Sequence, residues 1–166
     1  MVILLDLDGV LITTPSWRAV ESEPDGFFRF NAQATANLTT ILAATNAAVV
    51  LTTSHRINFS LSQWTAFFNT RGLVPAAITK VNDQTTLPAP GSRASEITAW
   101  VARPGNPTNY VVLDDDPSLH GLPLAIKNRC VFTKPLIGLD TVATQQVLHI
   151  LRSSAPPLSQ CSSLSG

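Results

Sequence analysis

The apolar residues of the chain gather in short continuous runs that are typical of buried β-strands. Three such runs cover residues 2–5, 47–51 and 110–113, and polar residues follow each of them directly. A short run that is apolar at every position indicates a strand buried on both faces, as in a parallel sheet. Weaker runs at 77–81 and 129–132 predict two further strands, the second of them at an edge of the sheet.

Between these runs, apolar residues recur at helical spacing, and polar residues stand where the helices should begin. Asn31, Ser60 and Ser92 are suitable N-caps, and Gln63 can complete a capping box with Ser60. A last amphipathic helix is expected at about 140–151. Because strands alternate with helices, we predict an α/β fold, a three-layer sandwich with a mostly parallel central sheet and helices on both faces.

Composition adds limits on size, charge and location. The 166 residues suit one domain, expected at 1–152, followed by a Ser- and Pro-rich tail at 153–166 that we expect to be disordered. Only 13% of residues are charged and the net charge is zero, so nothing indicates a surface built for long nucleic acids. The two cysteines do not suggest a disulfide, no signal peptide or membrane span is apparent, and we expect a cytoplasmic protein.

Polar clusters follow three of the predicted strands. Asp6 and Asp8 come after the first, Thr-Thr-Ser at 52–54 after the second, and three aspartates at 114–116 after the fourth. The carboxyl ends of parallel strands meet at one edge of the sheet, where open α/β sheets bind ligands. Carboxylates gathered there repel one another unless a cation neutralises them, and oxygen ligands favour Mg²⁺. No pair of Cys or His residues has the spacing of a zinc site.

These clusters resemble, in order, the four motifs of the haloacid dehalogenase (HAD) superfamily. Asp6-Leu7-Asp8-Gly9-Val10 resembles the first motif, Thr53 the second, Arg93 the basic residue of the third, and Asp114-Asp115 the fourth. The residues around the motifs are also similar to HAD domains attached to RNA repair proteins. The resemblance implies a Rossmann-like, HAD-like fold. The segment 10–31 is too short for a cap domain, so we predict a capless member.

The resemblance implies a role for each motif residue. Asp6 would attack the phosphorus atom and form an aspartyl-phosphate, while Asp8 would protonate the leaving oxygen and later activate water. Thr53 would hold the phosphoryl oxygens, and Arg93 would neutralise charge on Asp6 and on the transferred group. Lys80 competes with Arg93 for this role, but it lies further from the fourth motif than the family usually places the basic residue.

The resemblance also implies a magnesium site and a reaction. The ligands would be the Asp6 carboxylate, the Asp8 backbone carbonyl and Asp115, with Asp114 bound to the ion or to its waters. An acid two residues after the nucleophile is typical of the phosphatases and phosphomutases of the superfamily, and the mutases normally need a cap. We therefore predict a Mg²⁺-dependent phosphomonoesterase.

Substrate contacts are predicted beside the second motif, from Thr52, Ser54, His55 and Arg56. The alternative for His55 and Arg56 is that they cap the local turn. The irregular segment 11–30 would form a flap beside the site, where its aromatic residues either stack on a substrate or pack against the rim of the sheet.

Two further functions stay open. The substrate is predicted to be a phosphorylated small molecule or nucleotide, and a phosphorylated nucleic-acid end is the alternative that the resemblance suggests. A different class is a phosphate- and Mg²⁺-binding regulatory module, because receiver domains also gather aspartates around Mg²⁺. The Asp-x-Asp spacing after the first strand argues against a receiver domain.

Overall fold

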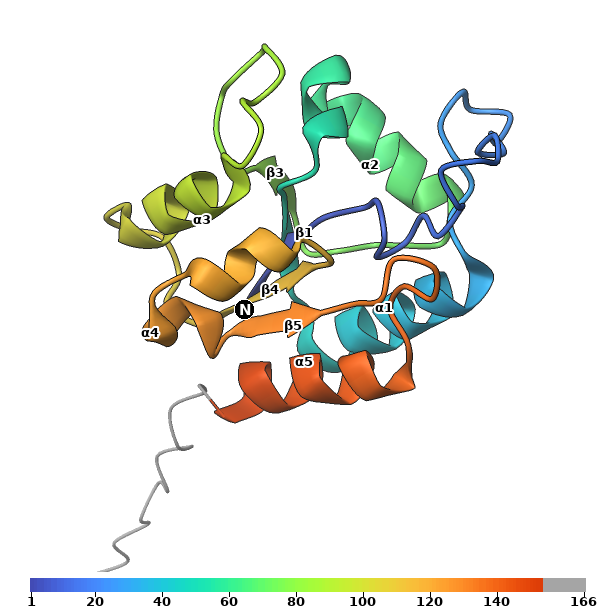
Figure 1. The fold of residues 1–166 in the computed structure, drawn as a ribbon. Helices are drawn as coiled ribbons and strands as arrows, with labels where there is room; N and C mark the ends of the chain where they lie inside the picture. The colour runs from blue at the N-terminus through green and yellow to red at the C-terminus, as the bar shows by residue number, and fades with distance from the viewer. Residues whose placement is uncertain (154–166) are drawn as a thin grey trace, which may run out of the picture.

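Five short strands form one sheet in which every neighbouring pair is parallel (Figure 1). The computed structural model describes residues 1–153 and orders the strands β3-β2-β1-β4-β5. The strands are β1 (Val2–Leu5), β2 (Ala48–Leu51), β3 (Ile78–Lys80), β4 (Tyr110–Asp114) and β5 (Cys130–Phe132). The first strand therefore lies at the centre, and the predicted edge strand β5 lies at an edge.

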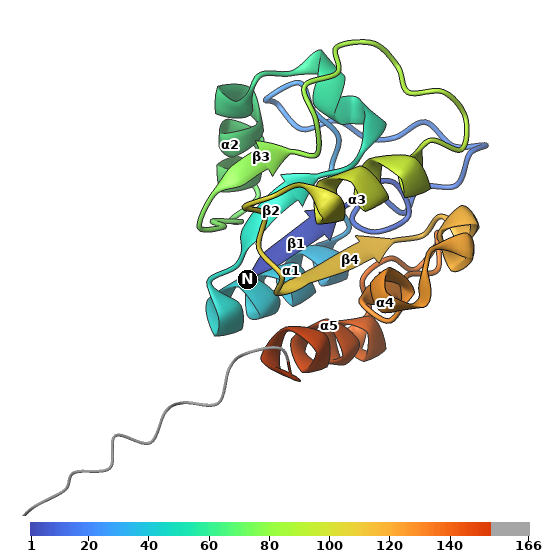
Figure 2. The same cartoon turned by 90° about the vertical axis from the view of Figure 1, so that its left-hand side faces the viewer.

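Helices cover both faces of this sheet. They are α1 (Ala32–Thr45), η1 (Ser54–Asn58), α2 (Leu61–Thr70), α3 (Arg93–Ala102), η2 (Pro117–Gly121), α4 (Leu124–Lys127) and α5 (Thr141–Ser153). The helices α1 and α5 lie on one face, and α3 and α4 lie on the other (Figures 1 and 2). This arrangement confirms the predicted α/β, Rossmann-like sandwich, and residues 1–153 contain no separate cap domain.

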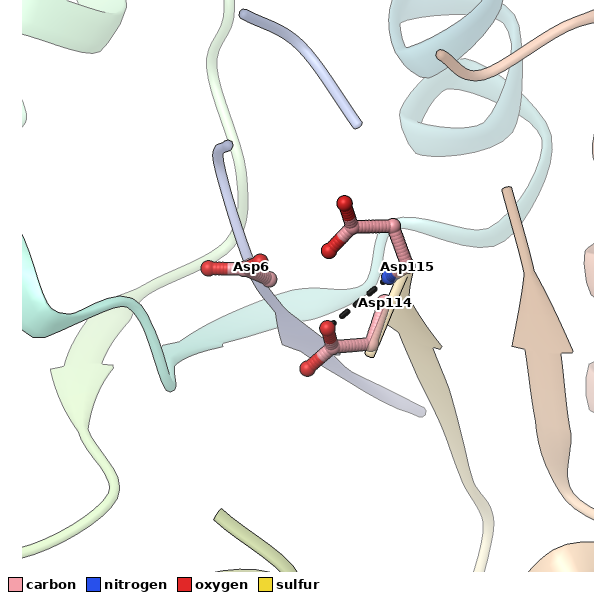
Figure 3. A group of neighbouring side chains, drawn as sticks. All are labelled: Asp6, Asp114 and Asp115. Atoms are coloured by element: carbon pink, nitrogen blue, oxygen red, sulfur yellow. Dashed lines mark hydrogen bonds between the residues drawn. The ribbon is translucent and has the colours of Figure 1, made fainter. Parts of the chain in front are cut away.

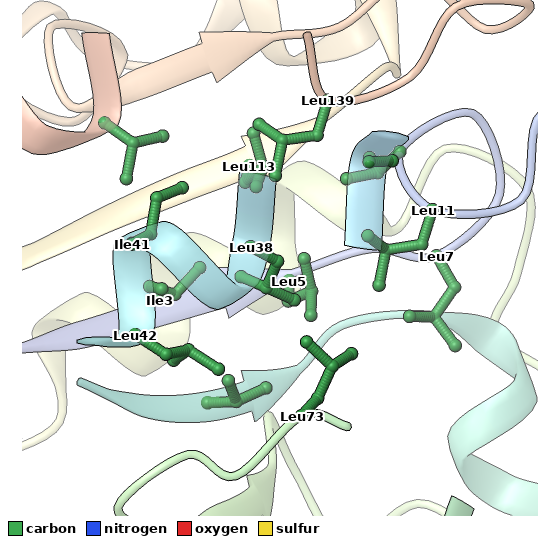
Figure 4. Packing of buried hydrophobic residues seen from close by; sticks show 14 of the residues in the cluster. Ile3, Leu5, Leu7, Leu11, Leu38, Ile41, Leu42, Leu73, Leu113 and Leu139 are labelled. Carbon is green, nitrogen blue, oxygen red and sulfur yellow. The ribbon is translucent and has the colours of Figure 1, made fainter. Parts of the chain in front are cut away.

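Alternation along the buried strands divides the core into two layers. Ile3 and Leu5 of β1 pack with α1 and α5 on one face (Figure 4), whereas Val2 and Leu4 pack toward α3 on the other. Successive side chains of a strand point to opposite faces, so a strand covered on both sides must be apolar throughout. This is why the central strands read as unbroken apolar runs in the sequence.

The predicted helix ends are mostly present. The Asn31 side chain accepts the N–H of Ala34 at the start of α1, and Ser60 and Gln63 form both bonds of a capping box at the start of α2. Ser92 precedes α3 as expected, but its side chain makes no capping hydrogen bond. These local signals set the helix boundaries, and hence the loops that carry the polar clusters.

Three short helices were not predicted. The elements η1, η2 and α4 have only four or five residues each, too few for helical periodicity to appear. Ser153, assigned to the tail from the sequence, belongs to α5. The disorder expected for 154–166 lies outside the described residues. Within residues 1–153, no helix has the length and apolar character needed to cross a bilayer.

Candidate active site

Three carboxylates meet where β1 and β4 end (Figure 3). Leu5 of β1 is aligned with Leu113 of β4, so the next residues along the two strands, Asp6 and Asp114, lie side by side. Asp115 follows directly, and one oxygen from each of the three carboxylates lies within 4.8 Å of the others. The sheet register itself therefore builds the acidic group predicted from the sequence.

Arg93, the first residue of α3, is the cation that reaches this group. Its Nη1 lies 2.6 Å from Asp114 Oδ2 and 3.4 Å from Asp6 Oδ1. The ammonium group of Lys80 instead donates to the carbonyl oxygen of Phe59 at 2.7 Å. The geometry thus favours Arg93 over Lys80 as the basic residue of the site.

Asp114 and Asp115 differ in how their oxygens are used. Asp114 is buried, its Oδ1 accepts the backbone N–H groups of Asp115 and Asp116 at 2.8 and 3.0 Å, and its Oδ2 accepts from Arg93. Asp115 is only half-buried, and among residues 1–153 no other residue donates a hydrogen bond to its carboxylate. Asp114 therefore holds the loop and the arginine, while Asp115 offers free oxygens to a ligand.

Burial and mutual repulsion raise the pKa values of two of these acids. Burial, with the charge of Asp114 in second place, raises the pKa of Asp6 well above its ordinary value even though Arg93 lies close to it. Burial and then Asp114 raise the pKa of Asp115 to about 6. One guanidinium thus does not balance three carboxylates, and a divalent cation is the natural counter-charge.

The loop after Asp6 folds tightly against Asp115. The carbonyl oxygen of Leu7 accepts three backbone N–H groups, from residues 10–12, and Gly9 takes a φ of +77°. A Cβ at Gly9 would overlap the carboxylate of Asp115, so glycine is required by both conformation and space. The hydroxyl of Thr133 donates to the Gly9 carbonyl at 2.7 Å and fixes the turn from the other side. Nothing in the sequence had pointed to Thr133.

The second motif contributes buried hydroxyl groups. The Thr53 hydroxyl accepts the backbone N–H of His55 at 3.3 Å and so caps η1. The Thr52 hydroxyl is buried, and it has no hydrogen-bond partner within residues 1–153. Ser54 is partly exposed and lines a cavity of about 310 Å³ together with Arg93, Asp116 and the loop 87–92. The cavity reaches the carboxylate group through Arg93, which lines it and pairs with Asp114 and Asp6.

Arg56 agrees with the second of its two predicted roles, capping of the local turn, and not with substrate contact. Its side chain is fully buried. It donates to the carbonyl oxygens of Thr52 and Thr53 at 3.0 and 3.1 Å and forms a 2.6 Å ion pair with Glu96. Arg56 follows the motif in sequence, yet η1 turns its side chain into the protein, where it supports the motif backbone from behind.

Asp8 and His55 face each other at the outer side of the site. Asp8 does not belong to the three-carboxylate group, and its side chain is 58% exposed. Its Oδ2 lies 2.9 Å from His55 Nε2. A separation of 47 residues hides this contact from any local reading of the sequence.

The buried aromatic residue of the flap packs against η1 and α2 rather than facing the site. Phe27 is buried in an aromatic group with Phe59, Trp64 and Phe67, which agrees with the interpretation that flap aromatics pack at the rim of the sheet. Trp17 is 78% exposed.

A larger cavity, of about 810 Å³, lies between β5 and α5, away from the carboxylates. It is lined mainly by apolar and amide side chains, and its one thiol, Cys130, is a poor nucleophile because burial raises its pKa to about 11. We therefore place the chemistry at the acidic group.

An Asp-x-Asp-Gly turn after the central strand, an aspartate pair after its neighbour and an arginine between them define a HAD-type site. Residues 2–143 match the family model described as the HAD domain in Swiss Army Knife RNA repair proteins, and the chain belongs to this family. Membership supports a phosphohydrolase-type activity. No curated protein sequence matches the chain.

Proposed function

We propose that the protein is a Mg²⁺-dependent phosphomonoesterase with Asp6 as its nucleophile. The observation that carries this proposal is the meeting of Asp6, Asp114 and Asp115 beside a single arginine. Hydrolysis of a phosphate ester needs a nucleophile, a proton donor and stabilisation of charge on the phosphoryl oxygens. Residues of the right kind for each of these tasks lie at this edge of the sheet.

The site suits a hard divalent cation. The donors are oxygen atoms held close together, and two of the acids have raised pKa values that a nearby positive charge would lower again. Asp6, Asp115 and the backbone carbonyl of Asp8 would hold Mg²⁺, with Asp114 contributing charge. When bound, the ion would neutralise the carboxylates and the phosphoryl group.

The proposed hydrolysis has two steps, transfer of the phosphoryl group to Asp6 and its release to water. An oxygen of Asp6 attacks phosphorus, the bond from phosphorus to the leaving oxygen breaks, and the leaving oxygen takes a proton from Asp8. Water then attacks the aspartyl-phosphate, gives a proton to Asp8, and releases inorganic phosphate with the Asp6 carboxylate regenerated. Arg93 and the second-motif residues Thr53 and Ser54 stabilise charge on the phosphoryl oxygens during both steps.

The test is hydrolysis of nitrophenyl phosphate by the purified protein. We expect phosphate release that EDTA abolishes and Mg²⁺ restores, and an Asp6→Asn variant that loses on the order of 10³-fold or more of kcat. Asp83→Asn, an exposed acid-to-amide change elsewhere on the chain, is the matched control and should keep full activity. Full activity in Asp6→Asn would rule out the mechanism. A stable phosphoprotein formed with acetyl phosphate, without turnover, would instead indicate a regulatory module.

The family description also suggests a nucleic-acid substrate. Because the matched family is that of HAD domains in RNA repair proteins, we propose phosphorylated RNA ends as a second candidate beside small phosphate esters. The comparison is kcat/KM for 3′- and 5′-phosphorylated oligonucleotides against nucleotides and sugar phosphates. Preference for an oligonucleotide end of at least about 100-fold would support a role in end processing.

A further inference from the structure

The geometry around Asp8 points to a role for His55 that differs from substrate binding. The Asp8 carboxylate is the most exposed of the four motif acids that follow β1 and β4. Within residues 1–153, His55 makes the only hydrogen bond to it, through Nε2 at 2.9 Å from Oδ2. An exposed carboxylate without such a contact samples several rotamers, and a proton donor must be held close to one geometry to act.

The histidine ring is itself held firmly. It makes T-shaped contacts with the rings of Phe27 and Phe28, with ring centres 5.8 and 5.6 Å away, and its side chain is only 24% exposed. Phe27 is buried in the aromatic group that reaches α2, stacked on Phe67 at 5.0 Å. The ring is thus fixed by the flap on one side and by its own backbone in η1 on the other.

The flap is fixed in turn by Arg71, which follows α2. Its guanidinium donates to the Phe28 carbonyl oxygen at 2.7 and 3.1 Å and makes two bonds to Asp25. A continuous chain of contacts therefore runs from α2 through the flap to His55 and ends on Asp8.

We propose that His55 is a positioning residue for Asp8, an inference that rests on the proposed function. The imidazole Nε2–H donates to Oδ2 of Asp8 and leaves Oδ1 to carry the proton that the leaving oxygen receives. In the second step Oδ1 takes the proton from the attacking water. His55 exchanges no proton with the substrate and does not hold the phosphoryl group.

The leaving group provides the test, because only a poor leaving group depends strongly on protonation. The substrates are phenyl phosphate and nitrophenyl phosphate, which have similar shapes but different leaving groups. We expect His55→Leu to lower kcat about 10-fold for phenyl phosphate and no more than about 3-fold for nitrophenyl phosphate, with KM little changed, since general acids contribute roughly 10²–10⁴-fold. His55→Gln keeps a donor at similar reach and should restore most of the loss.

A double-mutant cycle separates positioning of Asp8 from a merely structural role. In an Asp8→Asn background, His55→Leu should have no further effect on kcat, because the group on which it acts is gone. His149→Leu, a change at an exposed histidine of α5, should leave both substrates unaffected.

Two outcomes would overturn the inference. Equal losses for both substrates with a raised KM would mean that His55 binds the phosphoryl group, and an undiminished loss in the Asp8→Asn background would mean that it acts independently of Asp8. Neither outcome touches the proposed function, which fails separately if Asp6→Asn remains active.

Discussion

Two arginine–carboxylate pairs lie one turn apart on α3, and they differ in what surrounds them. Arg93 pairs with Asp114, Glu96 pairs with Arg56, and both distances are 2.6 Å. The Arg56–Glu96 pair is balanced in charge, because the other hydrogen bonds of Arg56 go to neutral groups, the Asn82 side chain and backbone carbonyl oxygens. It holds one positive and one negative charge.

The pair at Arg93 is not balanced. Asp6 and Asp115 lie beside Asp114, so three carboxylates share one guanidinium. A buried ion pair with balanced charge holds neighbouring segments together. A group with excess negative charge at the ends of two strands can instead bind a cation, and with it an anionic substrate. Removing a negative charge should therefore stabilise the metal-free protein at the Arg93 group and destabilise it at the Arg56–Glu96 pair.

The largest effect is expected for Arg56→Met. It leaves Glu96 buried without its partner and frees the carbonyl oxygens of Thr52 and Thr53, so the free energy of unfolding should fall by about 3–5 kcal/mol. Urea-induced unfolding measures this loss. Adding Glu96→Leu should recover most of it, and a loss below about 1 kcal/mol in the single variant would contradict a structural role.

The next effect is on catalysis. Arg93→Met should lower kcat/KM by about 10²–10³-fold, because the site loses its cation facing the transferred group. In the presence of Mg²⁺, Arg93→Met should lower the free energy of unfolding much less than Arg56→Met does. Arg93→Lys, which keeps the charge without the guanidinium geometry, should retain part of the activity. A near-normal kcat/KM in Arg93→Met would show that Arg93 has no part in the reaction.

The charge imbalance also predicts how pH and Mg²⁺ act on stability. Because the folded pKa values of Asp6 and Asp115 are raised, these two groups bind more protons in the folded protein than in the unfolded chain. For Asp115 this difference in bound protons lies between its ordinary pKa of 3.8 and its raised pKa of about 6. Without metal, stability should fall as pH rises through this window.

Added Mg²⁺ should reverse that loss, by about 2.7 kcal/mol at a hundredfold excess over its Kd. The gain should be larger at about pH 7.5 than at about pH 5, where Asp115 is mostly protonated and protons compete with the ion. Thermal unfolding with EDTA or Mg²⁺ at the two pH values measures it. A gain independent of pH would place the ion elsewhere.

The smallest effect compares the same chemical change at the two pairs. Asp115→Asn relieves repulsion, so the metal-free protein should become more stable by about 0.5–1 kcal/mol while losing its response to Mg²⁺. Glu96→Gln removes a balancing charge and should destabilise the protein. Unfolding midpoints of both variants in EDTA give the comparison, and destabilisation by Asp115→Asn would contradict the imbalance.

Local signals in the sequence sufficed for the sheet and for the acidic group. The runs at β1 and β4 end in Asp6 and Asp114, and parallel strands at the centre of a sheet bring such ends together. Arg93 was assigned from the resemblance to the third HAD motif, as the basic residue before the helix that leads to β4. These features depend on residues close in sequence and on the handedness of strand–helix–strand connections.

Other parts of the site depend on contacts that no local pattern reveals. For Arg56 the sequence left substrate contact and capping of the local turn open, because its position beside the second motif says nothing of the direction that η1 gives its side chain. Thr133 supports Gly9 across 124 residues, and His55 meets Asp8 across 47. Such pairs follow only when the whole chain is folded.

The anchoring of the flap has a consequence for how molecules reach the site. Releasing it would require breaking the bonds of Arg71 to Asp25 and Phe28 and withdrawing Phe27 from its aromatic neighbours, and exposing that ring alone costs about 1.5–3 kcal/mol. We therefore expect the segment around Phe27 and Phe28 to keep its position when a substrate binds, so that substrates of the proposed reaction are selected by their fit to a preformed site.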